Sequence, residues 1–292
     1  MLRVFPNELF KKSLLEVKDM KKKISIALCG FSFAMGALLP MDADAAAQAG
    51  SVPAVQAAAQ KSVSPTDASG FVLLSEAVPD IIQEIRYYTT YNFVGDHIDG
   101  YEEPCTLMTR EAAKALKAVS DDLMKQGYRL KVYDAYRPQK AVAHFVRWAE
   151  DLGDKRMMAY FYPKVDKTRL FEDGYIAAKS GHSRGSTIDL TLFDMATGKE
   201  VDMGGTFDHF GIESHPDWCG NPETGEYTGK YKGNNPPENG EINETQFQNR
   251  MLLRRAMMRH GFRPIDTEWW HFTLESEPYP DTYFTFPVRR MP

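Results

Sequence analysis

The chain has 292 residues, of which 43% are hydrophobic and 12% aromatic, which is enough apolar material for one core of substantial size or two small ones. Its formal net charge is −5, and no dense stripe of Lys and Arg follows residue 23. Because nucleic-acid binders carry a basic face, this composition argues against a nucleic-acid partner and favours a small-molecule or peptide substrate.

Residues 1–47 have the pattern of a secretory signal peptide. Three lysines directly follow Met20, an apolar run comes next, and small residues with two A-x-A cleavage patterns follow it. Met20 fits a start better than Met1, because it places the lysines at the N-terminus. The alternative is a membrane anchor, but the apolar run is shorter than the roughly 20 residues that a span needs. We expect cleavage, no stable membrane span afterwards, and a periplasmic or secreted protein.

Residues 48–69 are rich in Ala, Gln, Ser and Gly and are predicted to form a flexible linker. The composition is then steady and contains no internal repeat, so residues 70–292 are expected to form one domain. Cys105 and Cys219 remain after removal of the signal peptide. In an oxidising compartment they can form a disulfide, and two separate thiols are the alternative.

Three segments of the domain have the apolar spacing of helices. We expect these helices at 109–127, with Thr109 as the N-cap, at 138–153, with Pro138 in the first turn, and at 244–261. Strands are expected at 130–133, 186–192 and 269–274. Helices and strands do not alternate regularly, so the predicted fold class is α+β rather than a doubly wound sheet. The Gly-, Asn- and Pro-rich segment 219–240 predicts a long surface loop, either a lid over a site or a solvated insertion.

The residues YDAYRP at 133–138 lie where a predicted strand ends and a predicted helix begins. The guanidinium of Arg137 can stabilise the oxyanion that forms when hydroxide attacks a carbonyl group. It can equally pair with Asp134 to hold the turn. The position in the sequence does not separate these two roles.

Two motifs far apart in the sequence together predict a metal site, namely SGHSRGSTID at 180–189 and EWWH at 268–271. His182, Asp189 and His271 are a normal ligand set for catalytic zinc, with the fourth position left to water, and the two imidazoles favour zinc over other divalent ions. Zinc makes hydroxide available near neutral pH, and Glu268 has the chemistry of the base that takes the proton. The other five histidines are interpreted as hydrogen-bonded core residues: His97, His144, His209, His215 and His260.

The spacing of the candidate ligands makes demands on the backbone. Asp189 follows β-branched residues and is expected on a strand, whereas His182 lies an odd number of residues earlier and would face the other way in a continuous strand. The glycines of this segment permit a turn that folds His182 back above Asp189. Glu268 must likewise lie at a bend to act on the same water as His271.

In this order the motifs YDAYRP, SxHxxGxxxD, DMGxxFD and ExWH resemble those of the VanX-type D-alanyl-D-alanine dipeptidases, which belong to the wider group of zinc D,D-peptidases. The resemblance extends from about Phe71 to the C-terminus. It implies a catalytic domain with a small central antiparallel sheet flanked by helices, the Hedgehog/D,D-peptidase-like fold. One departure is Thr187, where the family usually carries alanine, and the long insertion after Cys219 is another.

By the same resemblance, one Zn²⁺ binds per chain and the substrate is a small D-amino-acid dipeptide. The resemblance implies a role for seven residues: zinc ligation by His182, Asp189 and His271, general base and acid catalysis by Glu268, stabilisation of the tetrahedral intermediate by Arg137, binding of the substrate amino group by Asp208, and a place in the pocket wall for Ser180.

The implied reaction is hydrolysis of D-alanyl-D-alanine to free D-alanine. Because the signal peptide predicts export, we expect this reaction to serve degradation or recycling of cell-wall peptides outside the cytoplasmic membrane. One alternative is a D,D-carboxypeptidase that trims peptidoglycan stem peptides. Another, of a different class, is a zinc-containing module that binds wall peptides without cutting them. The presence of both Glu268 and Arg137 favours an enzyme over the binding module.

Overall fold

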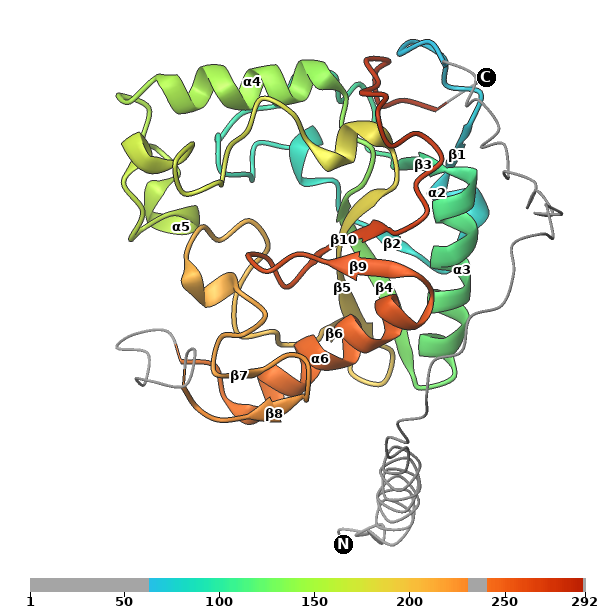
Figure 1. Ribbon diagram of the computed structural model, residues 1–292, viewed down its shortest axis with the longest axis vertical. Helices are drawn as coiled ribbons and strands as arrows, with labels where there is room; N and C mark the ends of the chain where they lie inside the picture. Colours follow the sequence, from blue (N-terminus) through green and yellow to red (C-terminus); the bar gives the residue numbers. More distant parts are fainter. Residues whose placement is uncertain (1–62, 231–240, 291–292) are drawn as a thin grey trace, which may run out of the picture. The chain divides into compact units, whose positions relative to one another are not determined.

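The central sheet of the computed structural model is built from six strands (Figure 1). Their order is β2 (Ile82–Gln83), β4 (Tyr128–Asp134), β5 (Thr187–Asp194), β10 (His271–Leu274) and β9 (Phe262–Pro264), with β6 (Lys199–Glu200) paired to β5. Every pair is antiparallel except β2–β4, which is parallel, so the prediction of an antiparallel sheet is wrong at this edge. The structure describes residues 63–230 and 241–290, so the predicted signal peptide and most of the predicted linker lie outside the described residues.

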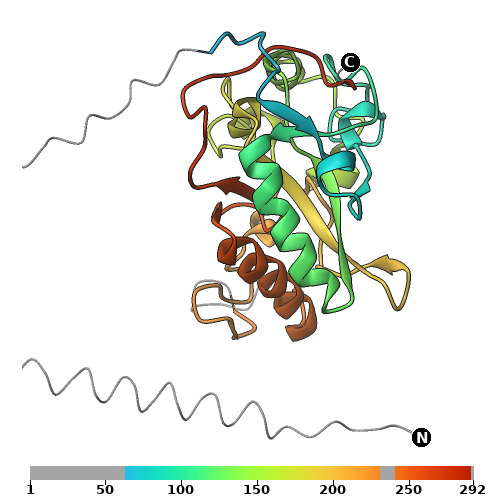
Figure 2. The same cartoon turned by 90° about the vertical axis from the view of Figure 1, so that its right-hand side faces the viewer.

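The two faces of β5 have opposite character, because successive side chains of a strand point to opposite faces. Ile188, Leu190 and Leu192 are buried on one face, whereas Asp189 and Thr191 alternate with them and line cavities. Helices α3 (Arg110–Met124) and α6 (Glu244–Arg259) pack against the sheet and against each other (Figure 2). We infer that they cover the apolar face, which leaves the other face free for a site.

The three predicted helices are confirmed, with differences at their N-termini. Thr109 is the N-cap of α3, but its hydroxyl makes no capping bond and lies 2.8 Å from Ser186 Oγ instead. Pro138 is the N-cap of α4 (Gln139–Glu150) rather than a residue of its first turn. Asn243 and Gln246 form a capping box at the start of α6. Within the described part of the chain, no helix is long and apolar enough to cross a membrane.

Two of the predicted strands are present as β4 and β5, and the third is shorter than expected. Strand β10 begins at His271, since Trp269 and Trp270 lie in a turn and the Trp269 N–H donates to the Ser214 carbonyl, outside the sheet, at 2.9 Å. The remaining elements are short: β1 (Phe71–Leu73) paired with β3 (Leu107–Thr109), α2 (Leu74–Ala77), α5 (Met158–Phe161), and the 3-10 turns η1 (Arg86–Tyr88), η2 (Lys167–Arg169), η3 (Gly181–Arg184) and η4 (Ile212–Ser214).

The segment 219–240 is not a plain loop where it is described. Its first part forms a hairpin of β7 (Gly220–Asn221) and β8 (Glu226–Tyr227), and Tyr227 packs on a small apolar cluster that contains Cys219 and Phe247. Cys105 lies in the main core instead, and both buried thiols are free. Of the two arrangements that the sequence left open, the structure has the two separate thiols, because each cysteine fills a different apolar cluster.

The five histidines interpreted as core residues are not buried. His97 is exposed and contacts the ring of Tyr88, and the other four are half-buried. Surface polar contacts explain two of them, because His260 bonds Asp122 at 2.9 Å and His144 accepts the N–H of Asp99 at 3.2 Å. The core placement is therefore wrong for all five, whereas the predicted hydrogen bonding is confirmed at His260 and His144.

Candidate metal centre

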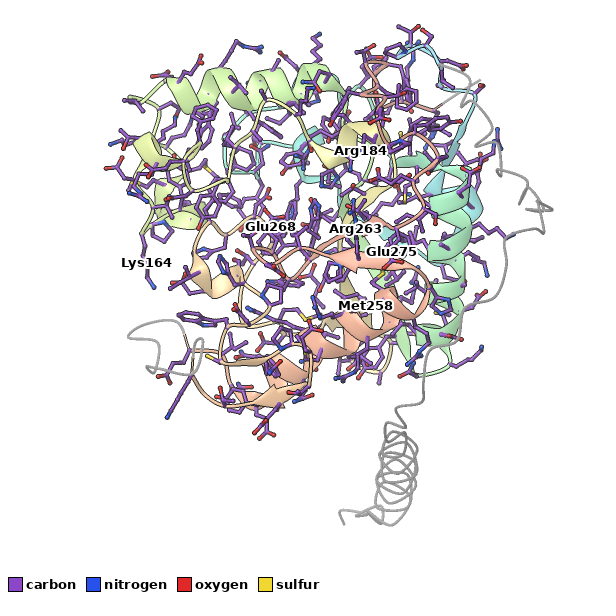
Figure 3. All side chains as sticks on the ribbon, in the orientation of Figure 1. Lys164, Arg184, Met258, Arg263, Glu268 and Glu275 are labelled. Atoms are coloured by element: carbon purple, nitrogen blue, oxygen red, sulfur yellow. The ribbon has the colours of Figure 1, made fainter. Side chains whose placement is uncertain are left out.

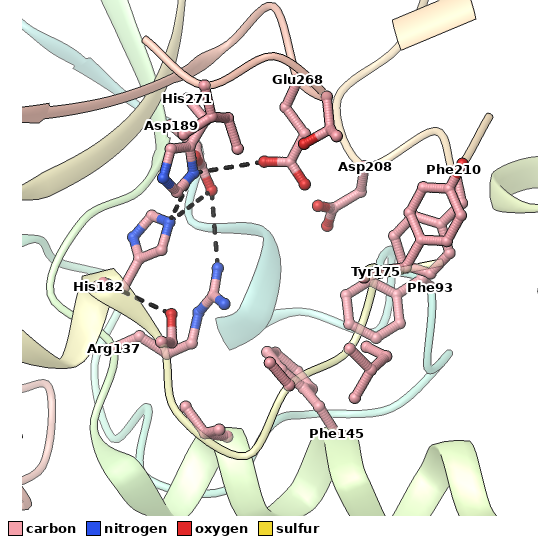
Figure 4. A pocket seen from close by; sticks show the side chains of 18 of the residues that line it. Phe93, Arg137, Phe145, Tyr175, His182, Asp189, Asp208, Phe210, Glu268 and His271 are labelled. Carbon is pink, nitrogen blue, oxygen red and sulfur yellow. Dashed lines mark hydrogen bonds and ion pairs between the residues drawn. The ribbon is translucent and has the colours of Figure 1, made fainter. Parts of the chain in front are cut away.

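Three elements bring His182, Asp189 and His271 together on the polar face of the sheet (Figure 4). His271, the first residue of β10, pairs directly with Asp189 of β5, so that both side chains lie on the same face. His271 Nδ1 lies 3.0 Å from Asp189 Oδ1 and 3.3 Å from His182 Nε2, which is itself 3.2 Å from Asp189 Oδ2. His182 and Asp189 are each 2% exposed, whereas the side chain of His271 is 14% exposed.

The turn η3 folds His182 back above Asp189, as the spacing of the two residues requires. Ser180 caps the turn by accepting the His182 N–H on its hydroxyl at 3.3 Å. Gly185 ends it at φ 82°, a left-handed conformation that favours glycine, and a Cβ there would overlap the ring of Phe71. Figure 3 labels Arg184, which lies in this turn. Its side chain joins the turn to the segment after β10 through two bonds to Glu277, of 2.8 and 2.7 Å.

The donor atoms fit a tetrahedral metal ion. Bonds of about 2.0–2.2 Å to zinc would place neighbouring ligand atoms roughly 3.3–3.5 Å apart, and the two imidazole nitrogens are 3.3 Å apart. His182 Nδ1 lies 2.7 Å from the Ala135 carbonyl, which assigns the proton to Nδ1 and leaves Nε2 free as a ligand. Asp189 Oδ1 is buried and, although it lies 3.0 Å from His271 Nδ1, it accepts no well-aligned hydrogen bond from the described residues. An orphaned carboxylate oxygen among imidazole nitrogens is the pattern of a metal site.

The electrostatics of the cluster favour positive charge at its centre. Burial raises the pKa of Asp189, but the neighbouring histidines outweigh burial and hold that pKa below its ordinary value. Burial likewise opposes charge on His271, yet the carboxylates of Asp189 and Glu268 raise the pKa of His271 to about 9. Two carboxylates and two imidazoles therefore form a pocket for a cation.

Glu268 lies at the bend that its predicted role requires. It precedes the turn at 269–270, and its Oε2 is 3.3 Å from His271 Nδ1. The side chain of Glu268 is 25% exposed and lines the cavity beside the cluster (Figure 4). A carboxylate that reaches both the ligands and the cavity can exchange a proton with a molecule bound there.

Arg137 pairs with Asp134 and also lines the cavity, so its side chain is placed for both of the roles that the sequence left open. Its Nε donates to Asp134 Oδ2 at 2.9 Å, and its Nη2 lies 3.6 Å from Asp189 Oδ2 while the residue lines the cavity. Asp134 is fully buried and accepts the hydroxyl of Tyr101 at 2.6 Å. A β-bulge between Val132 and Asp134 brings Asp134 into pairing with Asp189. The Asp134 contact therefore orients the guanidinium toward the cavity.

Asp208 faces the same cavity from the loop after β6. It has φ 61°, an uncommon conformation for a residue other than glycine, and accepts the hydroxyl of Tyr87 at 2.8 Å. Burial, followed by the charge of Asp189, raises the pKa of Asp208 well above its ordinary value. Tyr87 was not found by sequence reasoning, and the only signal for it is the aromatic-rich stretch at 87–93.

The cavity measures about 280 Å³, at the small end of the range for ligand pockets. Figure 4 shows Asp208 between the metal-ligand cluster and a group of aromatic side chains. Ser180 lines the cavity, as expected. The aromatic group was not predicted and comprises Phe93, Phe145, Tyr175 and Phe210. A buried His-Asp-His cluster beside a carboxylate and an arginine is the site of a metal-dependent hydrolase.

Comparisons with known proteins show which family of metal-dependent hydrolases the chain resembles. A model of the peptidase M15 family, described as D-ala-D-ala dipeptidase, matches residues 67–225 and 234–289. The D-alanyl-D-alanine dipeptidase of Enterococcus faecalis is 39% identical over 220 residues, which are 75% of this chain and 98% of that protein. The D-alanyl-D-alanine dipeptidase of Streptomyces coelicolor is 36% identical over 218 residues, 75% of this chain and 98% of that protein. The D-alanyl-D-alanine dipeptidase of Escherichia coli is 32% identical over 216 residues, 74% of this chain and 90% of that protein. The chain belongs to the D-alanyl-D-alanine dipeptidase family of metallopeptidases.

Proposed function

We propose that the protein is a zinc dipeptidase that hydrolyses D-alanyl-D-alanine to two molecules of D-alanine, with the fold of the zinc D,D-peptidases. The observation that carries this proposal is one small cavity that holds the His-Asp-His cluster, the carboxylate of Glu268 and the carboxylate of Asp208. Membership of the dipeptidase family supports the substrate.

His182, Asp189 and His271 would hold the zinc ion, one per chain. When bound, zinc supplies a Lewis acid and a water of lowered pKa. Glu268, next to His271, takes the proton of the attacking water and later gives it to the leaving amine. His182 and Asp189 are buried, whereas the side chain of Glu268 is 25% exposed and can exchange its proton with solvent between turnovers.

Arg137 stabilises the negative oxygen of the tetrahedral intermediate. Its guanidinium is held by Asp134 and stacks over the rings of Tyr87 and Phe145, with its central carbon 5.0 and 5.2 Å from their centroids. A donor fixed in this way before the reaction needs no reorganisation in the transition state. Removal of one such donor reduces kcat by about 10²–10³-fold in other hydrolases.

Asp208 binds the free amino group of the substrate, and Ser180 lines the same pocket. A buried carboxylate has a raised pKa on its own, and an ammonium group in contact with it favours the charged form. An acylated amine cannot form this ion pair and would leave the carboxylate without a partner, which discriminates strongly against it. We therefore expect the protein to prefer a free dipeptide over the end of a longer peptide.

The test is to incubate the zinc-loaded protein with D-Ala-D-Ala, and separately with its N-acetylated form, and to measure free D-alanine. We expect cleavage of the free dipeptide only, and its loss in Glu268→Gln. Cleavage of the acetylated form would instead indicate a D,D-carboxypeptidase that trims stem peptides. Absence of cleavage of either substrate would favour the zinc-containing binding module.

We further propose that the protein acts outside the cytoplasmic membrane, in degradation or recycling of wall-derived dipeptides. The support is the signal-peptide pattern of residues 1–47. Cell fractionation with N-terminal sequencing tests this, and we expect a mature N-terminus near residue 48 in the periplasm or medium. An uncleaved protein in the cytosol would contradict the proposal.

A further inference from the structure

Arg250 of α6 is a buried cation that binds backbone carbonyls instead of a carboxylate. It is 1% exposed, its Nε donates to the Met203 carbonyl at 2.7 Å, and its Nη1 donates to the Glu213 carbonyl at 2.9 Å. Among residues 63–230 and 241–290, its Nη2 has no hydrogen-bond partner. Burial lowers the pKa of Arg250 to about 9, so the guanidinium is charged at neutral pH. Burial of such a charged group is costly, so the backbone segments that it binds are the place to look for its role.

The two carbonyls are the ends of the loop that carries Asp208. We call residues 203–213 the Asp208 loop, in which Asp208 lies five residues from either end. Asp208 has φ 61°, a conformation that persists only when the surroundings enforce it. The middle of the loop is fixed by the ring of Phe207, stacked on Tyr133 at 4.7 Å. One guanidinium fixes both ends, because its planar fork presents several donors at once.

The same arginine lies beside the turn that carries Glu268. Its guanidinium carbon is 5.7 Å from the centroid of the Trp269 ring, and the Trp269 N–H donates to the Ser214 carbonyl at 2.9 Å. The Asp208 loop and the Glu268 turn are thus joined to each other and to α6 at one point. A shift of this point would move Asp208 relative to Glu268.

We propose that Arg250 is a positioning residue that sets the distance between the Asp208 carboxylate and the catalytic Glu268. The proposal rests on the proposed function where it assigns Asp208 to the substrate amine. Arg250 does not line the cavity, so it acts through the Asp208 loop. Loss of Arg250 therefore weakens recognition of the amino group more than it slows the chemical step.

Arg254, one helical turn further along α6, is a matched control. Its side chain is 8% exposed, and its Nη2 donates to the carboxylate of Glu223 at 2.7 Å, in the turn between β7 and β8. Arg254 lies on the same helix as Arg250 and is similarly buried, but it binds the turn between β7 and β8 instead of the Asp208 loop. A general effect of removing a buried arginine would affect both positions alike.

The first experiment compares Arg250→Met and Arg254→Met in the zinc-loaded protein, with D-Ala-D-Ala and N-acetyl-D-Ala-D-Ala as substrates. For Arg250→Met we expect KM for the free dipeptide to rise about 10-fold, with kcat within about 3-fold of wild type, and the preference over the acetylated form to narrow. Arg254→Met should leave KM within about 2-fold, and Arg250→Lys should restore part of the lost recognition. Equal changes in KM for both methionine variants, or no change for Arg250→Met, would overturn the proposal.

The second experiment does not depend on activity. Hydrogen exchange measured by mass spectrometry should be at least about 10-fold faster in residues 204–212 of Arg250→Met, whereas Arg254→Met should speed exchange in residues 220–228. If the wild-type protein fails to cleave D-Ala-D-Ala, the proposed function is wrong and exchange still tests the loop. Unchanged exchange at 204–212 overturns the positioning role. If Arg250→Met does not fold, hydrogen exchange is measured in Arg250→Lys instead.

Discussion

The two faces of β5 serve different purposes within one strand. Ile188, Leu190 and Leu192 pack in the core, whereas the alternate positions carry Asp189 and the hydroxyls of Thr187 and Thr191. The apolar face is stabilised by removal of hydrocarbon from water, which depends on volume and needs no specific partner. The polar face is equally buried but depends on partners, since a buried charge without one is costly.

Burial alone therefore does not separate structural from functional residues. Asp189 is as buried as the leucines beside it, yet one of its oxygens accepts no well-aligned hydrogen bond from the described residues. Asp134 and Asp208 are also buried, and each accepts a tyrosine hydroxyl. The polar face is kept for its chemistry, so substitutions there should affect activity, and substitutions on the apolar face should affect stability.

The largest effect is expected from Asp189→Asn, which breaks the polar face at the metal. The amide of asparagine has the shape of the carboxylate but not its negative charge. Without that charge next to the two imidazoles, the site should no longer bind zinc. We expect kcat/KM to fall by more than about 10³-fold, since the Lewis acid contributes several kcal/mol. Metal analysis and kinetics check this, with Asp194→Asn at the end of the same strand as the control. Retention of one zinc per chain in Asp189→Asn would contradict the assignment of the ligand.

The second largest effect is expected from Glu268→Gln. This variant tests whether the catalytic step can be impaired while the metal ligands on the same face still bind zinc. Removal of the base should lower kcat by about 10²–10⁴-fold while zinc content and the unfolding midpoint stay unchanged. Kinetics with metal analysis measure both quantities. The matched control is Glu275→Gln, an exposed carboxylate just after β10, which should retain full activity. Equal kcat values for the two variants would exclude Glu268 as the base.

The third prediction tests the apolar face. Leu190→Ala leaves a cavity in the core and should lower the free energy of unfolding by about 2–5 kcal/mol. Denaturant unfolding measures this change. The folded fraction should still bind zinc and cleave substrate, because the side chain points away from the site. Lost zinc binding in well-folded Leu190→Ala would show that the two faces are not independent.

The smallest effect is expected from Thr187→Ala, on the polar face but outside the cavity lining. The Thr187 hydroxyl lies 2.9 Å from that of Thr273 across the β5–β10 pair. Its loss should cost about 1 kcal/mol of stability and leave kcat/KM within about 2-fold of wild type. Thermal unfolding and kinetics decide this. A large loss of activity would show that the hydroxyl pair helps to align Asp189 with His271.

Much of the secondary structure was predictable because its signals are local. The apolar spacing and the glycine stops indicated α3, α4 and α6, and β-branched residues indicated β5. Errors arose where a distant partner competed with the local rule. Thr109 stands at the N-cap as predicted, yet its hydroxyl bonds Ser186, and β10 begins late because Trp269 bonds Ser214.

The site was predictable in part because its residues stand in recognisable motifs. The structure brings together His182, Asp189, His271 and Glu268, with Arg137, Asp208 and Ser180 around the same cavity. Two contributors were missed, Tyr87 and Arg250. An arginine on a helix is usually a surface residue, so nothing in its neighbourhood along the chain marks Arg250 as buried.

Local patterns in the chain were enough to predict the alternation of β5, the three main helices, and the residue types that a metal and a base require. These depend on neighbours two to four positions apart, which the chain specifies directly. Three contacts could be found in the folded protein alone: His271 pairs with Asp189, Tyr87 donates to Asp208, and Arg250 donates to both ends of the Asp208 loop. Such contacts join segments far apart in the chain, and they follow from the packing of the whole core rather than from any local pattern.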